Sequence, residues 1–535
     1  MPGYISSAFF TTRSHPRHNR IPAQTVLSPA IFITGGDYLK MKNVLAIDLG
    51  ASNGRVILVS SDGKQIELKE IHRFPNSGIH IGDRIYTDIL YLFQELITGM
   101  RKAFQATDSI DAFGIDAWGV DFALLDSSGE LVVNPYHYRD SQANGMIRKA
   151  DDLFGKGGLF SLTGVQNMWY NTVYQLLGIQ KRNPRILNNA QKFLMIADIL
   201  GYFFTERISM EYTGFSTTQM YDLRSKRIHP EILEKLLIPS SLFPELLMTG
   251  SPKGEVRDDV KKLLGIRPDK KLQMIATAQH DSASAAYAVP AEEESYIFIN
   301  SGTWSVIGMI TDKPVITQEV FECGLSNEGA AFGKVKLVKT VMGMWLIQEL
   351  RKYWERTGQR TDYGYLIDQA EHSDAFTHLI DTDDELFVAP SNMAEAINLY
   401  CSRTGQPAIV SQGTFYRTVM ESLALKYREC ADELERITGH NIRTLHLLGG
   451  ASQDPTFCKY IANATKRTVL AGPVEATAAG NGLIQLRALG CIDPDIPVSK
   501  IIRNSFQISQ YKPENTAAWD TQYQKYKKLC TNKHI

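Results

Sequence analysis

The sequence DLGASNGR at positions 48–55 lies between two short apolar runs, at 44–47 and 56–59. Much later in the chain, NSGTWS at positions 300–305 lies between apolar runs in the same way. Both patterns are typical of a strand–turn–strand hairpin, and their glycines allow the backbone to approach a ligand closely. Because backbone N–H groups in such turns bind phosphate oxygens, the two turns together predict a phosphate-binding site.

Similar orders of elements accompany the two turns. In the first half we expect strands at 44–47, 54–60, 66–74, 113–116 and 119–125, and a helix at 86–104. In the second half we expect strands at 296–299, 304–310, 334–339, 444–448 and 468–470, and helices at 343–356, 413–438, 455–464 and 476–489. The repeated order indicates an α/β protein of two ribonuclease H-like (actin-like ATPase) domains, facing across a cleft that holds the ligand.

The chain divides into four predicted parts. Residues 1–36 are basic and contain no Asp or Glu, which is typical of a targeting segment, but their apolar stretch is short and interrupted. We therefore interpret residues 1–42 as a disordered N-terminal extension. We expect a first domain at 43–290, a second domain at 291–490, and a tail at 491–535 that packs on the second domain.

The composition excludes several classes of protein. At 535 residues the chain is long enough for two or three domains. Hydrophobic residues make up 44% and charged residues 21%, and the net charge is −1, which is typical of a globular protein without a nucleic-acid partner. No apolar run approaches the roughly 20 residues of a membrane helix. The six cysteines are widely spaced and the twelve histidines show no H-x-x-x-H pattern, so we expect a cytoplasmic protein without structural zinc.

The sequence HDSAS at positions 280–284 follows an apolar run at 273–279 that we predict to be a strand. A carboxylate between two phosphate-binding turns is suited to accept the proton of a hydroxyl during phosphoryl transfer, so Asp281 is the candidate catalytic residue. The alternative is that Asp281 only caps a helix at 282–288, a position that Asp favours. The P-loop and protein-kinase motifs, which mark other phosphotransferases, are absent from the sequence.

Four further positions suggest ligand contacts on weaker grounds. Asp48, at the end of a predicted strand, is placed to hold a Mg²⁺ that also contacts phosphates. Trp118, Gly119 and Asp121, at the carboxyl end of another predicted strand, are candidates to stack on and bind a polyol. The alternative is that these three are ordinary core and turn residues.

Several stretches, in order along the chain, resemble one family. They are AIDLGASNGR (46–55), GIDAWGVDFALLD (114–126), HDSAS (280–284), INSGTWSVIG (299–308), SNEGA (326–330), VMGMWLIQ (341–348), LHLLGGASQ (445–453) and AGPVEATAAGN (471–481). Through them the chain is similar, from residue 44 to residue 490, to the FGGY carbohydrate kinases, and among these to the rhamnulokinases. The resemblance implies that the first domain binds a sugar and the second a nucleotide.

The resemblance also implies roles for matching positions. Contacts with ATP are implied for Ala51, Ser52, Asn53, Gly54, Arg55, Thr303, Gln348 and Gly450. The expected sugar-binding residues are Trp118, Gly119, His280, Asp281, Ser282 and Thr340, with Asp281 as the proton acceptor. Two positions depart from the rhamnulokinase pattern, which usually has Thr at the place of Ser282 and Asn at the place of Thr340. A threonine lacks the amide donor, so the contact with one sugar hydroxyl is expected to differ.

We therefore expect an ATP- and Mg²⁺-dependent kinase that phosphorylates the primary 1-hydroxyl of L-rhamnulose, acting as a monomer or homodimer without nucleic-acid or membrane partners. The same chemistry on L-fuculose or L-xylulose is the first alternative. A catalytically inactive sugar or nucleotide sensor would keep the cleft, but intact Asp48 and Asp281 count against it. An actin-like chaperone or filament ATPase would need the two hairpins but not the HDSAS carboxylate.

Overall fold

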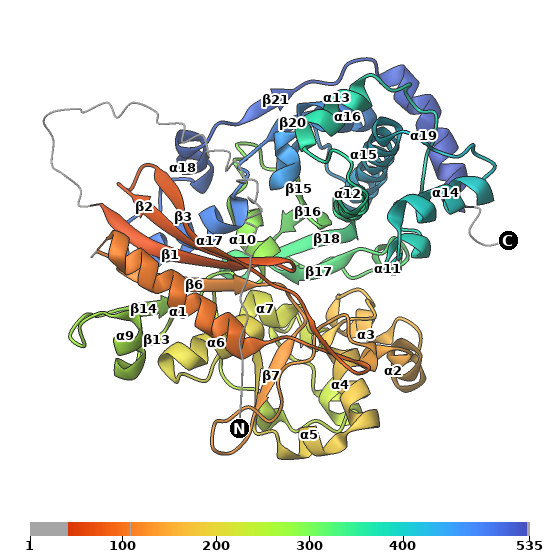
Figure 1. Cartoon of the computed structure of the whole chain (residues 1–535). Coiled ribbons are helices and arrows are strands. Elements are labelled where there is room, and N and C mark those ends of the chain that lie inside the picture. The colour runs from red at the N-terminus through yellow and green to blue at the C-terminus, as the bar shows by residue number, and fades with distance from the viewer. Residues whose placement is uncertain (1–40, 108, 532–535) are drawn as a thin grey trace, which may run out of the picture. The chain divides into compact units, whose positions relative to one another are not determined.

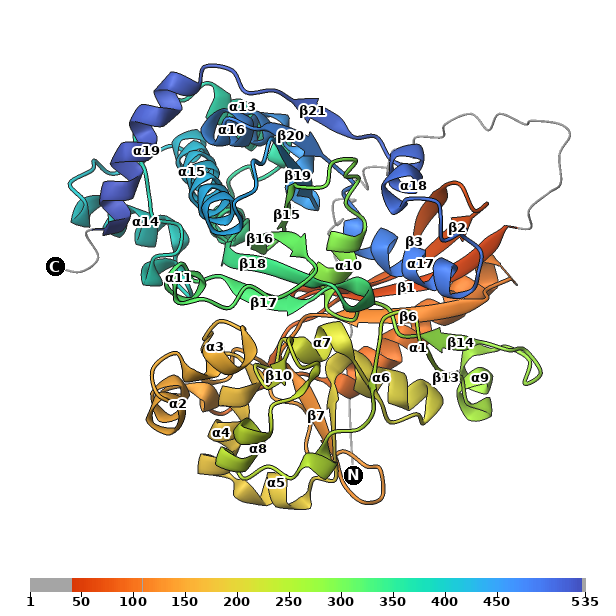
Figure 2. The same cartoon turned by 180° about the vertical axis from the view of Figure 1, so that it is seen from behind.

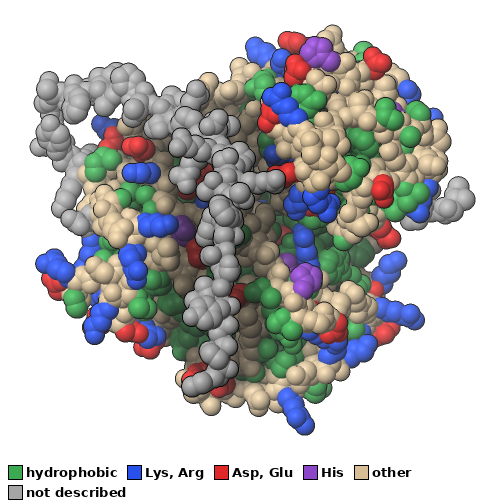
Figure 3. Space-filling view, in the orientation of Figure 1, with side chains coloured by type: hydrophobic (Ala, Val, Ile, Leu, Met, Phe, Trp, Pro, Cys, Tyr) green, Lys and Arg blue, Asp and Glu red, His purple; other side chains and the backbone are tan. Residues whose placement is uncertain are grey.

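Two mixed β-sheets form the centre of the molecule, and each contains one of the two glycine turns (Figure 1). The computed structural model describes residues 41–107 and 109–531, so residues 1–40 of the predicted extension lie outside the described residues. Within those two ranges, no helix combines the length and the apolar character needed to span a membrane. Acidic and basic side chains are interspersed over the described surface that Figure 3 shows.

The first sheet has the strand order β13-β14-β6-β1-β2-β3. Its strands are β1 (Lys42–Leu49), β2 (Asn53–Ser61), β3 (Ile66–Pro75), β6 (Ala112–Ala117), β13 (Pro252–Glu255) and β14 (Gln273–Ile275). The second sheet has the order β17-β18-β16-β15-β19-β20-β21. Its strands are β15 (Ile297–Ser301), β16 (Trp304–Thr311), β17 (Ser326–Gly329), β18 (Val335–Met342), β19 (Thr444–Leu448), β20 (Thr468–Ala471) and β21 (Ser509–Tyr511).

The two sheets match strand for strand. The series β3-β2-β1-β6-β14-β13 corresponds to β18-β16-β15-β19-β20-β21. Every adjacent pair has the same parallel or antiparallel sense in both series. The prediction of two ribonuclease H-like domains is therefore confirmed. β17 is an additional edge strand that has no counterpart in the first sheet.

Helices cover the sheets, and their buried faces have the predicted helical spacing. The longest, α15 (Gln412–Thr438), buries a stripe that includes Val419, Leu423 and Tyr427. It begins after Ser411, whose hydroxyl accepts a backbone N–H of the first turn.

The other helices are α1 (Ile89–Ala106), α2 (Met146–Phe154), α3 (Gly158–Thr163), α4 (Thr172–Arg182), α5 (Pro184–Asn189), α6 (Ile196–Thr205), α7 (Tyr212–Ser216), α8 (Pro230–Lys235), α9 (Asp258–Leu264), α10 (Asp281–Tyr287), α11 (Gln318–Glu322), α12 (Trp345–Arg356), α13 (Tyr363–Glu371), α14 (Met393–Arg403), α16 (Pro455–Thr465), α17 (Ala476–Ala488), α18 (Val498–Ser505) and α19 (Thr516–Thr531). Among the shorter strands, β7 (Phe122–Leu125) pairs with β8 (Lys192–Met195).

Two predicted strands are shorter in the structure than in the prediction. The extended run expected at 119–125 is only β7, because Val120 has a left-handed φ of 68° that interrupts the strand. The strand expected at 273–279 ends at Ile275, because the residues beyond it make separate hydrogen bonds and no regular ladder.

We refer to the described residues up to Pro290 as the first lobe and to those from Ala291 as the second lobe. Each lobe has its own apolar core, and a third apolar cluster lies between the sheets. At this place α10 and α17 pack against each other, and α17 also covers β1 and β6 (Figures 1 and 2). Each lobe thus contributes one helix, α10 or α17, to the contact between the lobes.

The tail expected to pack on the second domain contributes β21 to the second sheet, and α19 packs against α15 and α16. Before these elements, α18 contacts β3 of the first sheet, where the hydroxyl of Ser505 accepts the N–H of Ile66 (2.8 Å). The tail therefore contacts both lobes.

Gly480 in α17 is expected to tolerate no side chain. A methyl group on it would lie 1.9 Å from the carbonyl oxygen of Ser284 in α10. The change Gly480→Ala is therefore expected to lower the free energy of unfolding by about 1–3 kcal/mol, the usual effect of overpacking. Denaturant unfolding of the purified variant measures this change.

Gly364 in α13 is the matched control, because it is also helical but a methyl group on it would meet nothing nearer than 3.8 Å. Gly364→Ala is expected to raise the free energy of unfolding by up to about 1 kcal/mol, since alanine has fewer unfolded conformations to lose. Equal stability changes in the two variants would contradict the close contact between α10 and α17.

Candidate active site

A pocket of about 540 Å³ lies between the two lobes. Both glycine turns line it, the first after β1 and the second after β15. The turns are closed in similar ways, since the N–H of Gly50 donates to the carbonyl of Asn53 (3.0 Å) and the N–H of Gly302 donates to the carbonyl of Trp304 (2.9 Å). Two turns that are far apart in the sequence therefore face one cavity.

The pocket contains all but one of the predicted site residues. Those that line it are Asp48, Ala51, Ser52, Asn53, Arg55, Trp118, Gly119, His280, Asp281, Ser282, Thr303, Thr340, Gln348 and Gly450. Gly54 is the exception. The phosphate contact predicted for Gly54 is not supported, because this residue does not line the pocket. It lies within β2, where a Cβ atom would lie 2.3 Å from the ring of Phe74, so this glycine makes room for packing.

Asp281 is the first residue of α10 and lines the pocket. The helix begins one residue earlier than predicted, with His280 in the N-cap position, so Asp281 is not the N-cap residue itself, although its carboxylate lies in the first turn of the helix. The Oδ1 atom of Asp281 accepts the N–H of Ser282 (2.6 Å). Burial raises the pKa of Asp281, His280 offsets part of this effect, and the carboxylate of Asp48 raises the pKa further.

Arg55 connects the two lobes beside the first turn. Its guanidinium forms ion pairs with Asp48, its register partner on β1, and with Glu475, which directly precedes α17. Burial opposes the charge of Arg55, but these two carboxylates raise its pKa. A guanidinium in this place is suited to bind phosphate oxygens. The sequence reasoning did not select Glu475, although it lies in the motif AGPVEATAAGN.

Asp116 on β6 brings a third carboxylate close to Asp48 and Asp281. It is the register partner of Asp48, and burial, together with the charges of Asp48 and Asp281, raises its pKa. Its Oδ2 accepts from the side-chain amide of Asn481 (2.5 Å), whereas its buried Oδ1 has no hydrogen-bond partner among the described residues. The sequence reasoning missed Asp116, because a single Asp in a strand has many ordinary roles.

These carboxylates fit a Mg²⁺ that completes its coordination with other ligands. Mg²⁺ usually binds one or two protein carboxylates together with water and substrate phosphates, and a divalent cation would relieve the repulsion between them. Within the described ranges, no group of three or more His, Cys, Asp or Glu residues is arranged to hold a metal ion. The role of Asp48 in metal binding therefore stays a prediction that involves the phosphates of the substrate.

Three of the residues predicted to contact ATP, Thr303, Gln348 and Gly450, belong to the second lobe and line the pocket. The hydroxyl of Thr303 donates to Oε1 of Gln348 in α12 (3.2 Å). Gly449, with a φ of 79°, turns the chain between β19 and the 3-10 helix η5 (Gly450–Gln453). A Cβ atom on Gly450 would meet nothing within 4 Å, so there is open space beside its backbone. A ligand can therefore approach the chain closely at this position.

The residues predicted to bind a sugar include a strained segment of the first lobe. The indole N–H of Trp118 donates to Asp121 (2.9 Å), and the N–H of Val120 donates to the hydroxyl of Thr217 (3.0 Å). Gly119 lies so close to Thr217 that a Cβ atom would be 3.0 Å from its side chain. The left-handed φ of Val120 is unusual for a β-branched residue, and such strain concentrates at functional sites.

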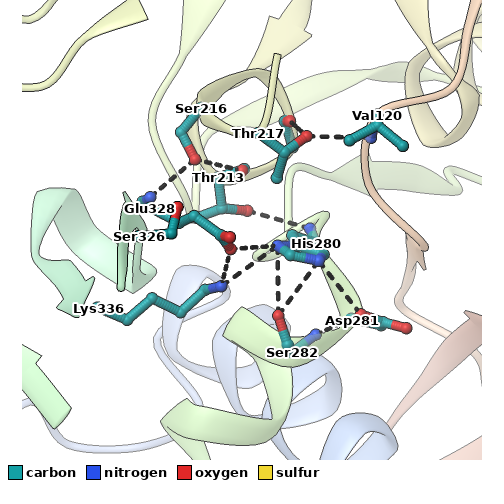
Figure 4. Close-up of polar contacts among 12 residues, drawn as sticks. Val120, Thr213, Ser216, Thr217, His280, Asp281, Ser282, Ser326, Glu328 and Lys336 are labelled. Atoms are coloured by element: carbon teal, nitrogen blue, oxygen red, sulfur yellow. Dashed lines mark hydrogen bonds and ion pairs between the residues drawn. The ribbon is translucent and has the colours of Figure 1, made fainter. Parts of the chain in front are cut away.

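His280, another predicted sugar-binding residue, contacts two residues of the second lobe (Figure 4). Its Nδ1 lies 3.3 Å from Oε2 of Glu328 on β17, and Glu328 forms an ion pair with Lys336 on β18. The hydroxyl of Ser282 lies 3.2 Å from both ring nitrogens of His280. Glu328 belongs to the SNEGA stretch, but the sequence reasoning assigned no role to it or to Lys336.

Two family models match the chain, and together they cover most of it. The model for the N-terminal domain of the FGGY family of carbohydrate kinases matches residues 43–288, and the model for the C-terminal domain matches residues 297–489. This chain belongs to the FGGY family of carbohydrate kinases. The expectation of a sugar kinase is thereby confirmed. Membership of this family implies that ATP is a substrate of this kinase.

Curated relatives and solved structures agree with this family. A rhamnulokinase from Bacteroides thetaiotaomicron is 36% identical over 486 residues, which are 91% of this kinase and 99% of that protein. A rhamnulokinase from Halalkalibacterium halodurans is 34% identical, covering 88% and 99% of the two chains. A ligand-bound xylulose kinase from Lactobacillus acidophilus has a TM-score of 0.76 at 18% identity, covering 92% and 98%. A glycerol kinase from Plasmodium falciparum, solved with ADP, has a TM-score of 0.73 at 16% identity, covering 92% and 99%.

Proposed function

We propose that this carbohydrate kinase transfers the γ-phosphoryl group of ATP to the 1-hydroxyl of L-rhamnulose, giving L-rhamnulose 1-phosphate and ADP. The observation that carries the phosphoryl transfer is the position of Asp281, which lines one pocket together with both glycine turns. The choice of sugar is supported by the rhamnulokinases that align with nearly the whole kinase.

The proposed reaction assigns a separate task to each side of the pocket. The hydroxyl oxygen of the sugar attacks the γ-phosphorus, the bond from this phosphorus to the β–γ bridging oxygen breaks, and Asp281 accepts the hydroxyl proton. Backbone N–H groups of the two turns and the guanidinium of Arg55 stabilise the phosphate charge. A Mg²⁺ held by Asp48 would supply further neutralisation of this charge. Closure of the lobes around the pocket excludes water, which would otherwise compete with the sugar as acceptor.

The first alternative is another ketose, because two positions in the pocket depart from the rhamnulokinase pattern. Ser282 keeps the hydroxyl of the usual threonine, but Thr340 replaces an amide side chain. Thr340 lies on β18 opposite Val306 and lines the pocket. A smaller donor at this point alters the hydrogen bonds offered to the sugar.

A panel of ketoses incubated with ATP tests the proposed function. L-rhamnulose, L-fuculose and L-xylulose are compared at equal concentration, and release of ADP is measured by a coupled assay. The highest kcat/KM is expected for L-rhamnulose. A higher kcat/KM for one of the other two ketoses would establish the alternative, and ADP release that is the same with and without every sugar would contradict a ketose kinase.

Thr340→Asn is expected to change kcat/KM for ketoses by a few-fold to about tenfold while the KM for ATP stays nearly constant. The reason is that a hydrogen bond to a neutral hydroxyl contributes roughly 0.5–1.5 kcal/mol. Thr340→Val, which removes only the hydroxyl, is the matched control for the shape of the pocket. A gain for L-rhamnulose indicates a restored contact, a loss indicates a pocket adapted to threonine, and unchanged kinetics with every ketose would place Thr340 outside the sugar site.

A further inference from the structure

β17 is the strand without a counterpart in the first sheet, and all four of its residues contact the first lobe. The hydroxyl of Ser326 accepts the N–H of Gln166 (3.1 Å), the N–H of Asn327 donates to the carbonyl of Gly164 (2.9 Å), the N–H of Gly329 donates to the hydroxyl of Ser216 (2.7 Å), and Glu328 reaches His280. The strand is thus bonded to the second sheet on one side and to the first lobe on the other. Side chains on β17 are therefore held in place relative to both lobes.

Glu328 and Lys336 form an ion pair between neighbouring strands beside the pocket. They are register partners on β17 and β18, and their side chains are 14% and 0% exposed. Burial opposes the ionisation of Glu328, but the ammonium of Lys336 holds its pKa below its usual range. A buried ammonium therefore lies next to the imidazole of His280, and its Nζ is 3.4 Å from Nδ1 (Figure 4).

Three charged groups surround the ring of His280. Lys336 and Asp281 favour a proton on Nε2, whereas Glu328, whose Oε2 lies 3.3 Å from Nδ1, favours a proton on Nδ1 but already has its charge paired with Lys336. An ammonium group can only donate hydrogen bonds, so a hydrogen bond from Lys336 to Nδ1 requires Nδ1 to be the acceptor and the ring proton to be on Nε2. On the other side of the ring, Nε2 lies 3.6 Å from Oδ1 of Asp281, where an N–H is attracted and a lone pair is repelled. The opposite tautomer could donate to Glu328, but it would direct its proton toward the ammonium and its lone pair toward Asp281.

This tautomer affects the two oxygens of the Asp281 carboxylate differently. Oδ1 accepts the N–H of Ser282 (2.6 Å) and faces Nε2 of His280. Within the described part of the chain, no hydrogen bond reaches Oδ2. The arrangement fixes one oxygen of the carboxylate and leaves the other available to a substrate hydroxyl.

We propose that Glu328 and Lys336 are positioning residues for the phosphoryl transfer, which hold His280 as the Nε2–H tautomer and thereby orient Asp281 with Oδ2 toward the acceptor hydroxyl. The inference rests on the proposed function of Asp281 as the proton acceptor. Because the ion pair belongs to the second lobe while His280 and Asp281 belong to the first, the alignment of Asp281 depends on contact between the lobes.

The tautomer can be measured on the wild-type kinase without substrate. In ¹⁵N-histidine NMR spectra at neutral to slightly alkaline pH, the signals of His280 are identified by their loss in His280→Gln. We expect an unprotonated Nδ1 and a protonated Nε2. A proton on Nδ1, with or without one on Nε2, would overturn the proposal. This measurement is made on the wild-type kinase, so it does not require a Glu328 or Lys336 variant to fold.

The kinetic test removes the ammonium with Lys336→Met, using the ketose that the substrate panel identifies. We expect kcat to fall about 10- to 100-fold, the range for loss of a hydrogen bond to a charged group, with the KM for ATP unchanged. Lys339→Met is the matched control, because Lys339 lies on the same strand and pairs with Glu433 (2.8 Å), and neither residue lines the pocket. It is expected to keep the wild-type kcat.

Equal kcat values for the Lys336→Met and Lys339→Met variants would overturn the positioning role. This failure is distinguishable from failure of the proposed function. If Asp281 is not the proton acceptor, the Asp281→Asn variant keeps its activity, whereas the tautomer of His280 in the wild-type kinase is measured independently of that result.

Discussion

Asp281→Asn is expected to lower kcat by about 10²–10⁴, the usual contribution of a general base, while the fold and ATP binding persist. The amide has nearly the shape of the carboxylate and its oxygen still accepts the N–H of Ser282, so α10 is expected to begin in the same place. What the variant loses is the ability to take a proton from the sugar hydroxyl. Steady-state kinetics measure kcat, and thermal unfolding with and without ATP measures folding and nucleotide binding.

Asp258→Asn is the matched control for this change. Asp258 is also the first residue of a helix, α9, but it does not line the pocket. Both variants lose a favourable charge at a helix N-terminus, which contributes about 0.3–1 kcal/mol to stability. Only Asp281→Asn is expected to lose activity. If it turns over sugar at nearly the wild-type rate, Asp281 is not the proton acceptor.

Lys253→Met is expected to lower the free energy of unfolding by about 3–5 kcal/mol, the usual result of leaving a buried charge without its partner. Lys253 and Asp198 form an ion pair inside the first lobe (2.5 Å), and their side chains are 0% and 1% exposed. Lys253 also donates to the carbonyl of Ser209 (2.9 Å). Without the ammonium, the carboxylate of Asp198 stays buried with no cation beside it. Denaturant unfolding measures the loss.

The stability loss in Lys253→Met is also expected to depend on pH. Burial raises the pKa of Asp198 above its ordinary value of 3.8 even when Lys253 is present. Because the folded-state pKa exceeds the unfolded one, the penalty for burying the charge is absent below the unfolded pKa and develops as pH rises through the folded pKa. Removal of the ammonium raises the folded pKa further, so the deficit of the variant is expected to shrink as pH falls from about 7 toward about 4.

Two further variants check the explanation for Lys253. Asp198→Leu combined with Lys253→Met removes both charges and is expected to recover much of the lost stability. Lys352→Met removes an exposed partner of Glu349, with the lysine side chain 63% exposed, and is expected to change stability by only about 0–1 kcal/mol. A loss below about 1 kcal/mol for Lys253→Met would contradict the uncompensated-charge explanation.

The sequence alone predicted the elements whose signals are local. The stripe along α15 repeats at helical spacing, so its buried face could be read from the order of residues. The turns after β1 and β15 are marked by glycines between apolar runs, and their repetition predicted the two matching sheets. Asp281 could be selected because a carboxylate, a strand end and a resemblance in sequence coincide at one short stretch.

Other site residues could not be predicted, because their roles arise from contacts between distant segments. Asp116 is an ordinary strand residue until the register with β1 places it beside Asp48. Gly54 belongs to a glycine-containing stretch that is typical of a phosphate-binding turn. In the structure its lack of a side chain makes room for the ring of Phe74, which packs against β2. In both cases the neighbour that gives the residue its function comes from another strand.

The sequence by itself determined the two-domain α/β architecture, the two turns and the candidate proton acceptor. The reason is that turn formation and periodic burial depend on residues close together in the sequence. Only the tertiary structure placed β17 between the lobes and brought the Glu328–Lys336 pair against His280. The residues of β17, Ser-Asn-Glu-Gly, have low strand propensity and no apolar alternation. Hydrogen bonds from the second sheet and from the first lobe hold this strand in place, and such long-range partners cannot be read from a four-residue segment.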